Sequence, residues 1–145
     1  MVVTFFGSKD APLEIGSQLR NVLVRLIEKE KADTFYVGDQ GPFDRLVRQI
    51  LKNLKTVYPQ IHYSVVIAYL NKPSQWADGE DYSDAVFPAG IAASQPKVAI
   101  LNRNLWMIKH ADTVVTYVTN DQSHTNKFIA LAKKQGKRLL PLEMV

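Results

Sequence analysis

The feature that most constrains this chain is a regular alternation of short apolar, β-branched runs with longer segments whose apolar residues recur at helical spacing. Residues 2–6 form the first run, and the segment after it carries an amphipathic stripe made of Leu19, Val22, Leu23, Leu26 and Ile27. A second run at 34–37 ends at Gly38, and its stripe consists of Phe43, Leu46, Val47, Ile50, Leu51 and Leu54. This alternation predicts right-handed βαβ crossovers and a mainly parallel sheet.

The middle of the chain is less regular. Residues 63–69 are a third, nearly continuous apolar run, which is typical of a parallel strand covered on both faces. Residues 71–96 hold three prolines and an acidic stretch, and they predict a long crossover. Residues 97–101 are expected to be extended, as a short strand or as the lead-in to a helix at 102–111 that Asn102 would cap.

The last third returns to the pattern. A strongly β-branched strand is predicted at 113–118, then a helix at 128–135 that ends at Gly136, then a strand at 138–142. With 145 residues the chain has the usual size of one domain. We therefore expect a single α/β domain over residues 1–145, a Rossmann-like three-layer sandwich with helices on both faces of the sheet.

Composition narrows the function classes. The chain has no cysteine, which excludes disulfides, thiolate metal sites and cysteine nucleophiles. Residues 1–6 are apolar without a preceding basic region, so neither a signal peptide nor a membrane span is predicted and a cytoplasmic location is expected. The net charge of +4 and a pI near 9.3 favour anionic ligands.

Three predicted strand-to-helix turns could carry a ligand. They are residues 7–10 after the first strand, residues 38–44 after the second, and residues 119–125 after the strand at 113–118. In a parallel sheet these turns share one edge, where glycine lets backbone amides approach a phosphate. None of them is a Walker A or three-glycine dinucleotide motif, so tight turns without a ligand remain the alternative.

Residues 35–44, 58–61, 82–84 and 103–108 together are similar to the YpsA-like branch of the SLOG superfamily. This resemblance implies a Rossmann-like fold related to the DNA-processing protein DprA and to the Lonely Guy phosphoribohydrolases. It also implies a nucleotide-type ligand at the turns. The ligand-binding residues predicted from the turns and the matching motifs are Gly7, Ser8, Lys9, Gly38, Asp39, Gly41, Phe43, Asp44, Arg103, Asn104, Asp121, Ser123 and His124.

The chain also departs from that family. Gly7-Ser8-Lys9 stands where relatives begin with Gly-His-Arg, and Ser123-His124 stands where they have a Gly-Gly pair. The glutamate-containing glycine motif of the Lonely Guy enzymes is missing as well. These departures argue against phosphoribohydrolase catalysis, and no catalytic residue is assigned.

Several side chains have a structural interpretation beside the functional one. Asp44 could cap the second helix or contact a ribose or base. Arg103 could bind phosphate, but pairing with an acid such as Asp84 or Asp112 is favoured. Trp106 and Met107 are expected in the core.

We therefore expect a domain that binds or senses a nucleotide or a nucleotide-derived ligand. One alternative is an N-glycosidase or phosphoribohydrolase in which Asp44 or Asp39 supplies the acid and Lys9 or Arg103 holds the phosphate. Another is DprA-like binding of single-stranded DNA. No cofactor is assigned; residues 78–84 could hold magnesium, although an acidic run is more often a solvated loop. A homodimer or higher homo-oligomer is expected, and no membrane partner.

Overall fold

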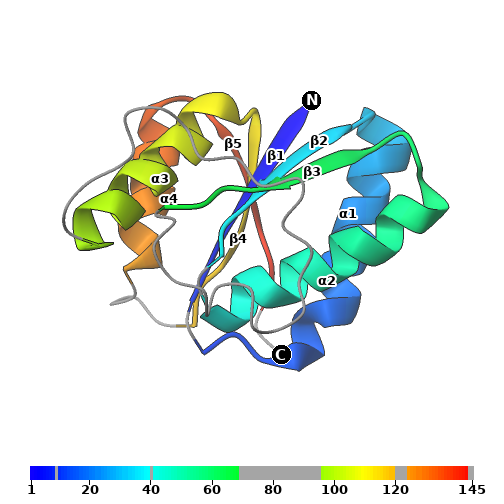
Figure 1. The fold of residues 1–145 in the computed structure, drawn as a ribbon, viewed down its shortest axis with the longest axis horizontal. Coiled ribbons are helices and arrows are strands. Elements are labelled where there is room, and N and C mark those ends of the chain that lie inside the picture. Colours follow the sequence, from blue (N-terminus) through cyan, green and yellow to red (C-terminus); the bar gives the residue numbers. More distant parts are fainter. Residues whose placement is uncertain (9, 40, 69–95, 120–123, 144–145) are drawn as a thin grey trace.

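The computed structural model describes residues 1–8, 10–39, 41–68, 96–119 and 124–143 (Figure 1). Strands and helices alternate along the chain. In order they are β1 (Val2–Gly7), η1 (Leu13–Ile15), α1 (Gly16–Glu30), β2 (Thr34–Val37), α2 (Gly41–Val57), β3 (His62–Val65), α3 (Pro96–His110), β4 (Thr113–Tyr117), α4 (Thr125–Lys134) and β5 (Arg138–Pro141).

The strands form one sheet in the order β3-β2-β1-β4-β5, and every neighbouring pair is parallel. Helices α1 and α2 lie on one face of the sheet, and α3 and α4 lie on the other (Figure 1). The Rossmann-like three-layer fold with a parallel sheet is therefore confirmed. The central strand β1 places its carboxyl end between those of β2 and β4.

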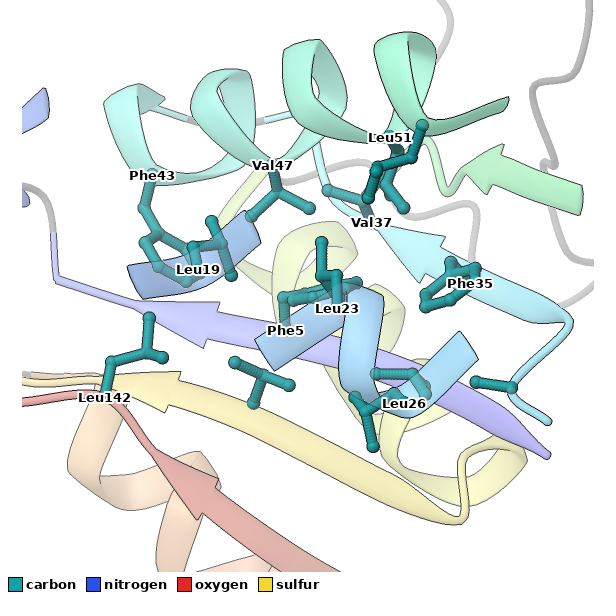
Figure 2. Close-up of a cluster of buried hydrophobic side chains, with 14 of the residues drawn as sticks. Phe5, Leu19, Leu23, Leu26, Phe35, Val37, Phe43, Val47, Leu51 and Leu142 are labelled. Carbon is teal, nitrogen blue, oxygen red and sulfur yellow. The ribbon is translucent and has the colours of Figure 1, made fainter. Parts of the chain in front are cut away.

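The larger core lies between the sheet and the α1–α2 layer (Figure 2). Val3 and Phe5 of β1 point into it, and Phe5 stacks on Phe35 of β2 with ring centroids 6.3 Å apart. The helical stripe predicted from the sequence supplies Leu19, Leu23 and Leu26, all of which are buried. Burying each such side chain stabilises the fold by about 1.5–3 kcal/mol.

A second, smaller cluster lies between the sheet and the α3–α4 layer. Alternation along β1 turns Phe6 to this face, where it stacks on Phe128 of α4 at 5.6 Å. Met107 is buried here, and Trp106 packs at the margin, edge-on to Tyr36 at 4.9 Å. The expectation that Met107 belongs to the core is confirmed, and Trp106 is partly buried beside it.

The predicted extended segment at 97–101 is wrong. Those residues are the first turns of α3, so the helix begins near Pro96 and Asn102 lies inside it instead of capping it. A short apolar run is compatible with either a strand or a helix, and only its packing decides. Here Ala99 is buried while Val98 is exposed, which is the pattern of a helix with one buried side.

The third strand is an edge strand. The ladder of β3 ends at Val65, and His62 at its start is exposed, so the expected two-sided coverage is not found along the strand. The buried apolar run instead continues beyond the ladder through Val66, Ile67 and Ala68. In the described part of the chain, no helix is both long and apolar enough to cross a membrane.

Candidate functional site at the carboxyl edge of the sheet

The carboxyl ends of all five parallel strands lie along one edge of the sheet, so the turns after β1, β2 and β4 are neighbours. These are the three turns in which the sequence predicted ligand-binding residues. Two sets of hydrogen bonds organise the edge. One joins the β1 turn to the β4 turn, and the other joins the β2 turn to α3.

Ser8 fastens the β1 turn to the β4 turn. Its backbone N–H donates to the carbonyl oxygen of Tyr117 at 2.9 Å, and its Oγ accepts from the N–H of Thr119 at 3.2 Å. The Thr119 hydroxyl in turn donates to Oδ1 of Asp10 at 2.7 Å. Because Ser8 is only 3% exposed, its hydroxyl acts in the structure as a connector between the two turns.

Gly7 and Phe43 are in close contact. A Cβ atom added at Gly7 would overlap three carbon atoms of the Phe43 ring, so the ring lies directly over the end of β1. Phe43 is buried, and it points from the first turn of α2 toward the sheet (Figure 2). This contact explains why position 7 is glycine, and it places Phe43 in the core beneath the edge.

The β2 turn is held by a buried ion pair. Nη1 of Arg103 donates to Oδ1 of Asp39 at 2.9 Å, and both side chains are at most 4% exposed. The same Nη1 donates to the carbonyl oxygen of Val66 at 3.3 Å, and Nε donates to Oδ1 of Asn104 at 2.8 Å. Of the two uses predicted for Arg103, the structure has it paired with an acid.

That acid was not among the predicted partners. Asp112 instead accepts from the backbone N–H of Val2 at 2.8 Å, near the amino end of β1, and Asp84 lies outside the described residues. Asp39 occupies the position at the end of β2 where dinucleotide-binding folds carry the acid that contacts a ribose hydroxyl. Its carboxylate here faces Arg103.

Gly38 permits this close packing. A Cβ atom added there would lie 2.5 Å from Oδ2 of Asp44 and 2.9 Å from Nη1 of Arg103. Arg48 also reaches the turn, because its Nη1 donates to the carbonyl oxygen of Gly38 at 3.1 Å. Sequence reasoning missed Arg48, which is buried on the inner side of α2; its position four residues after Asp44 was the available signal.

The predicted ligand-binding residues thus divide into two groups. Ser8, Gly38, Phe43, Arg103 and Asn104 are buried and form the floor of the edge, as does the Asp39 side chain, and Gly7 beside them is half-buried. Gly41 and His124 are exposed and Asp44 is half-buried, at the first turns of α2 and α4. Lys9, Asp121 and Ser123 lie outside the described residues.

Gly41 has a backbone requirement of its own. Its φ of +83° lies in the left-handed region that side chains disfavour, although a Cβ atom there would meet nothing within 4 Å. No group of three or more His, Asp or Glu side chains able to hold a metal ion occurs among the residues that the structure describes. The acidic run considered for magnesium, 78–84, falls outside them.

Comparisons with known proteins agree with this architecture. A family model described as the YspA SLOG family (YpsA) matches residues 2–144. Among solved structures, DNA processing protein A (DprA) from Streptococcus pneumoniae superposes with a TM-score of 0.70 at 15% identity, over 99% of this chain and 50% of that one.

A second DprA, from Helicobacter pylori, superposes with a TM-score of 0.67 at 17% identity, over 100% of this chain and 66% of that one. That structure concerns the unique mode in which the Helicobacter pylori protein binds single-stranded DNA. This chain therefore spans about half to just under two thirds of the DprA proteins that it matches. No curated protein matches.

Proposed function

This chain belongs to the YpsA family of SLOG proteins, and from that premise we propose that it binds a nucleotide or a nucleotide-derived ligand at the carboxyl edge of its sheet. The ligand would lie above the turns that follow β1 and β4. The phosphate would be held there by backbone N–H groups and by the positive end of α4.

The observation that carries this proposal is the direct link between the β1 and β4 turns through Ser8 and Thr119. The chain leaves β1 toward the α1–α2 layer and leaves β4 toward the α3–α4 layer, so the strand order reverses between these two strands (Figure 1). Open α/β sheets bind ligands in the crevice at such a reversal. Here the two turns that would flank the ligand are joined to each other by hydrogen bonds.

We assign different roles to the buried and the exposed residues of the edge. The buried group, which includes Ser8, Gly38 and Arg103, fixes the shapes of the turns. His124, exposed at the start of α4, and the half-buried Asp44 would contact the ligand, together with Lys9, Asp121 and Ser123 from the sequence. A rigid floor lowers the ordering cost of binding.

The alternatives make different demands on the same edge. A glycosidase would need a carboxyl group that reaches the ligand; Asp39 faces Arg103, and Asp44, whose Oδ2 lies beside Gly38, is the other carboxylate predicted for this role. Single-stranded DNA binding, described for the Helicobacter pylori DprA, would need a longer basic track. Nucleotide binding needs only the local features that the turns supply.

Isothermal titration calorimetry with AMP, ADP, ATP, NAD⁺, ADP-ribose and oligo-dT tests the proposal. We expect a mononucleotide or dinucleotide to bind, and Thr119→Val to weaken it about fivefold, because the variant loses the hydrogen bond to Asp10, worth about 1 kcal/mol. Thr56→Val is the matched control. Its hydroxyl donates to the carbonyl oxygen of Asn53 near the other end of α2, away from the candidate site.

The outcomes separate the functions. Binding that weakens in Thr119→Val but not in Thr56→Val supports the proposed site. Release of free base during the titration would favour the glycosidase. Binding of oligo-dT alone, with an affinity that falls steeply as salt rises, would favour DNA binding. Absence of heat with every nucleotide would refute the proposal.

A further inference from the structure

Helix α3 is apolar on two sides. Ala99 and Met107, eight residues apart on one side, are buried, and Met107 packs in the cluster between the sheet and the α3–α4 layer. Val98, Leu101 and Leu105 recur at spacings of three and four on another side, and Val98 is 41% exposed. Among the described residues this second side meets α4, yet Val98 is exposed and Leu101 and Leu105 are only half-buried, so the described part of the chain does not cover it fully.

A groove runs between α3 and α4 along this second side. It has a volume of about 280 Å³ and an almost wholly apolar lining. Leu101 and Leu105 line it from α3, and Phe128, Ala130 and Leu131 line it from α4. The side chains of Lys127 and Lys134, seven residues apart on α4, stand at the same groove. The surface thus combines an apolar centre with positive charge.

The charged side chains of the two helices that line the groove have one sign. Neither α3 nor α4 contains an aspartate or a glutamate, and five of their lysines are exposed: Lys97, Lys109, Lys127, Lys133 and Lys134. The opposite layer is mixed, since α1 and α2 carry Glu28, Glu30 and Asp44 among their basic residues. Two copies of the chain that met through two α3–α4 faces would bring lysine against lysine, which costs free energy.

From these observations we propose that the α3–α4 surface docks an acidic amphipathic helix of a partner protein. Apolar side chains at helical spacing would enter the groove, and flanking carboxylates would face the lysines, as in helix-in-groove recognition. A nucleic acid fits less well: Phe128 is half-buried and already stacked on Phe6, so it offers no open ring to a base. The proposal does not depend on nucleotide binding.

The probe is a fluorescent helical peptide of about 14 residues, or roughly four turns, with leucines at i, i+3, i+4 and i+7 and glutamates on both flanks. A peptide of the same composition with its leucines spread around the helix is the control ligand. We expect the first peptide to bind in a fluorescence anisotropy titration, more weakly as salt rises, and the second to bind at least about tenfold more weakly.

Two variants place the binding on this surface. Ala130→Glu introduces a carboxylate at an exposed groove position, and Lys134→Glu reverses a charge at the rim. Each should weaken peptide binding by about tenfold or more, because like charges across an interface repel. The matched controls are Gln49→Glu and Lys52→Glu, at exposed positions of α2 in the other layer, and they should leave the affinity unchanged.

Thermal melts followed by circular dichroism establish that each variant is folded. If Ala130→Glu does not fold, Lys134→Glu alone tests whether the peptide binds at this surface. Equal weakening by the α2 variants would overturn the proposal, as would equal affinity for the two peptides or no binding at all. If oligo-dT displaced the peptide and bound more tightly than it, the surface would be assigned to a nucleic acid instead. Tighter binding of anionic phosphatidylserine vesicles would assign it to a membrane. Self-association abolished by Ala130→Glu would assign it to a second copy.

Discussion

Asp39 and Arg103 form a buried ion pair, 2.9 Å long, that ties the turn after β2 to the α3 helix on the far face of the sheet. The guanidinium also donates to the carbonyl oxygen of Val66 beyond β3, so one side chain connects three segments at the carboxyl edge. Each charge of this pair is removed from water. The stability of the edge therefore depends on both partners being present.

Removing either partner alone should destabilise the fold strongly. We expect Arg103→Met or Asp39→Asn to lower the free energy of unfolding by about 3–5 kcal/mol, because each leaves a buried polar or charged group without its partner. Urea denaturation monitored by circular dichroism measures the loss. The free energy of unfolding of Arg103→Lys should lie between those of the unmodified chain and Arg103→Met. The ammonium group keeps the charge but cannot reproduce the guanidinium's bonds to Asp39 and Asn104.

The double variant Arg103→Met with Asp39→Asn is the control for this prediction. It should be more stable than the sum of the single losses implies, because it leaves neither charge behind. Purely additive losses, or single losses below about 1 kcal/mol, would show that the pair is solvated and not structural.

The contact between Gly7 and Phe43 predicts a steric effect. Gly7→Ala places a methyl group inside the Phe43 ring and should cost about 1–3 kcal/mol in unfolding free energy, as overpacking of a core does. Phe43→Leu in the same chain should recover part of that cost by making room. Thermal unfolding of the three variants checks both statements.

Gly16→Ala is the matched control for Gly7→Ala. Gly16 has helical φ and ψ of −55° and −43°, and an added Cβ atom would lie in ordinary contact with Cδ1 of Leu46 at 3.7 Å. This variant should be neutral or more stable by about 0.5–1 kcal/mol, because alanine loses less entropy in a helix. Equal losses in both alanine variants would contradict the packing argument.

The ion pair between Asp39 and Arg103 predicts that the proposed site discriminates little between ribose and deoxyribose nucleotides. The carboxylate that would select a ribose hydroxyl at this position is already paired, so AMP and dAMP should bind with affinities within about threefold of each other. Calorimetry with the two nucleotides measures the ratio. A preference for AMP above about tenfold that disappears in Asp44→Asn would instead assign ribose recognition to Asp44.

Tyr58 predicts a pH effect between α1 and α2. Its hydroxyl donates a hydrogen bond to the carboxylate of Glu28, and this bond raises the pKa of the phenol above its ordinary 10.0. A raised pKa in the folded state means that the bond stabilises the protein below about pH 10 and that its contribution disappears as the pH rises through the folded pKa.

An NMR titration of Tyr58 with a labelled ring measures this value, and Glu28→Gln should return it toward 10.0 because the negative charge is lost. Tyr58→Phe should lower stability at neutral pH, and the difference from the unmodified chain should shrink in strongly alkaline solution. A Tyr58 pKa that is the same with and without the Glu28 charge would show that the two groups do not interact.

Local patterns predicted most of the fold. The runs at 34–37 and 113–118 and the stripes beginning at Leu19 and Phe43 were assigned correctly, because hydrophobic periodicity is set within a few residues of each position. Residues 97–101 were misassigned because an apolar run has no period of its own. Their helical state depends on tertiary packing, in which Ala99 is buried and Val98 is left exposed.

The sequence by itself determined the parallel α/β class and the edge at which the turns gather, because right-handed crossovers allow few other arrangements. Only the tertiary structure decided what the residues of those turns do. Asp39 and Arg103 are 64 positions apart, and Phe43 covers Gly7 across two elements. Such pairings follow from how layers pack in three dimensions, on which the local pattern of either partner carries no information.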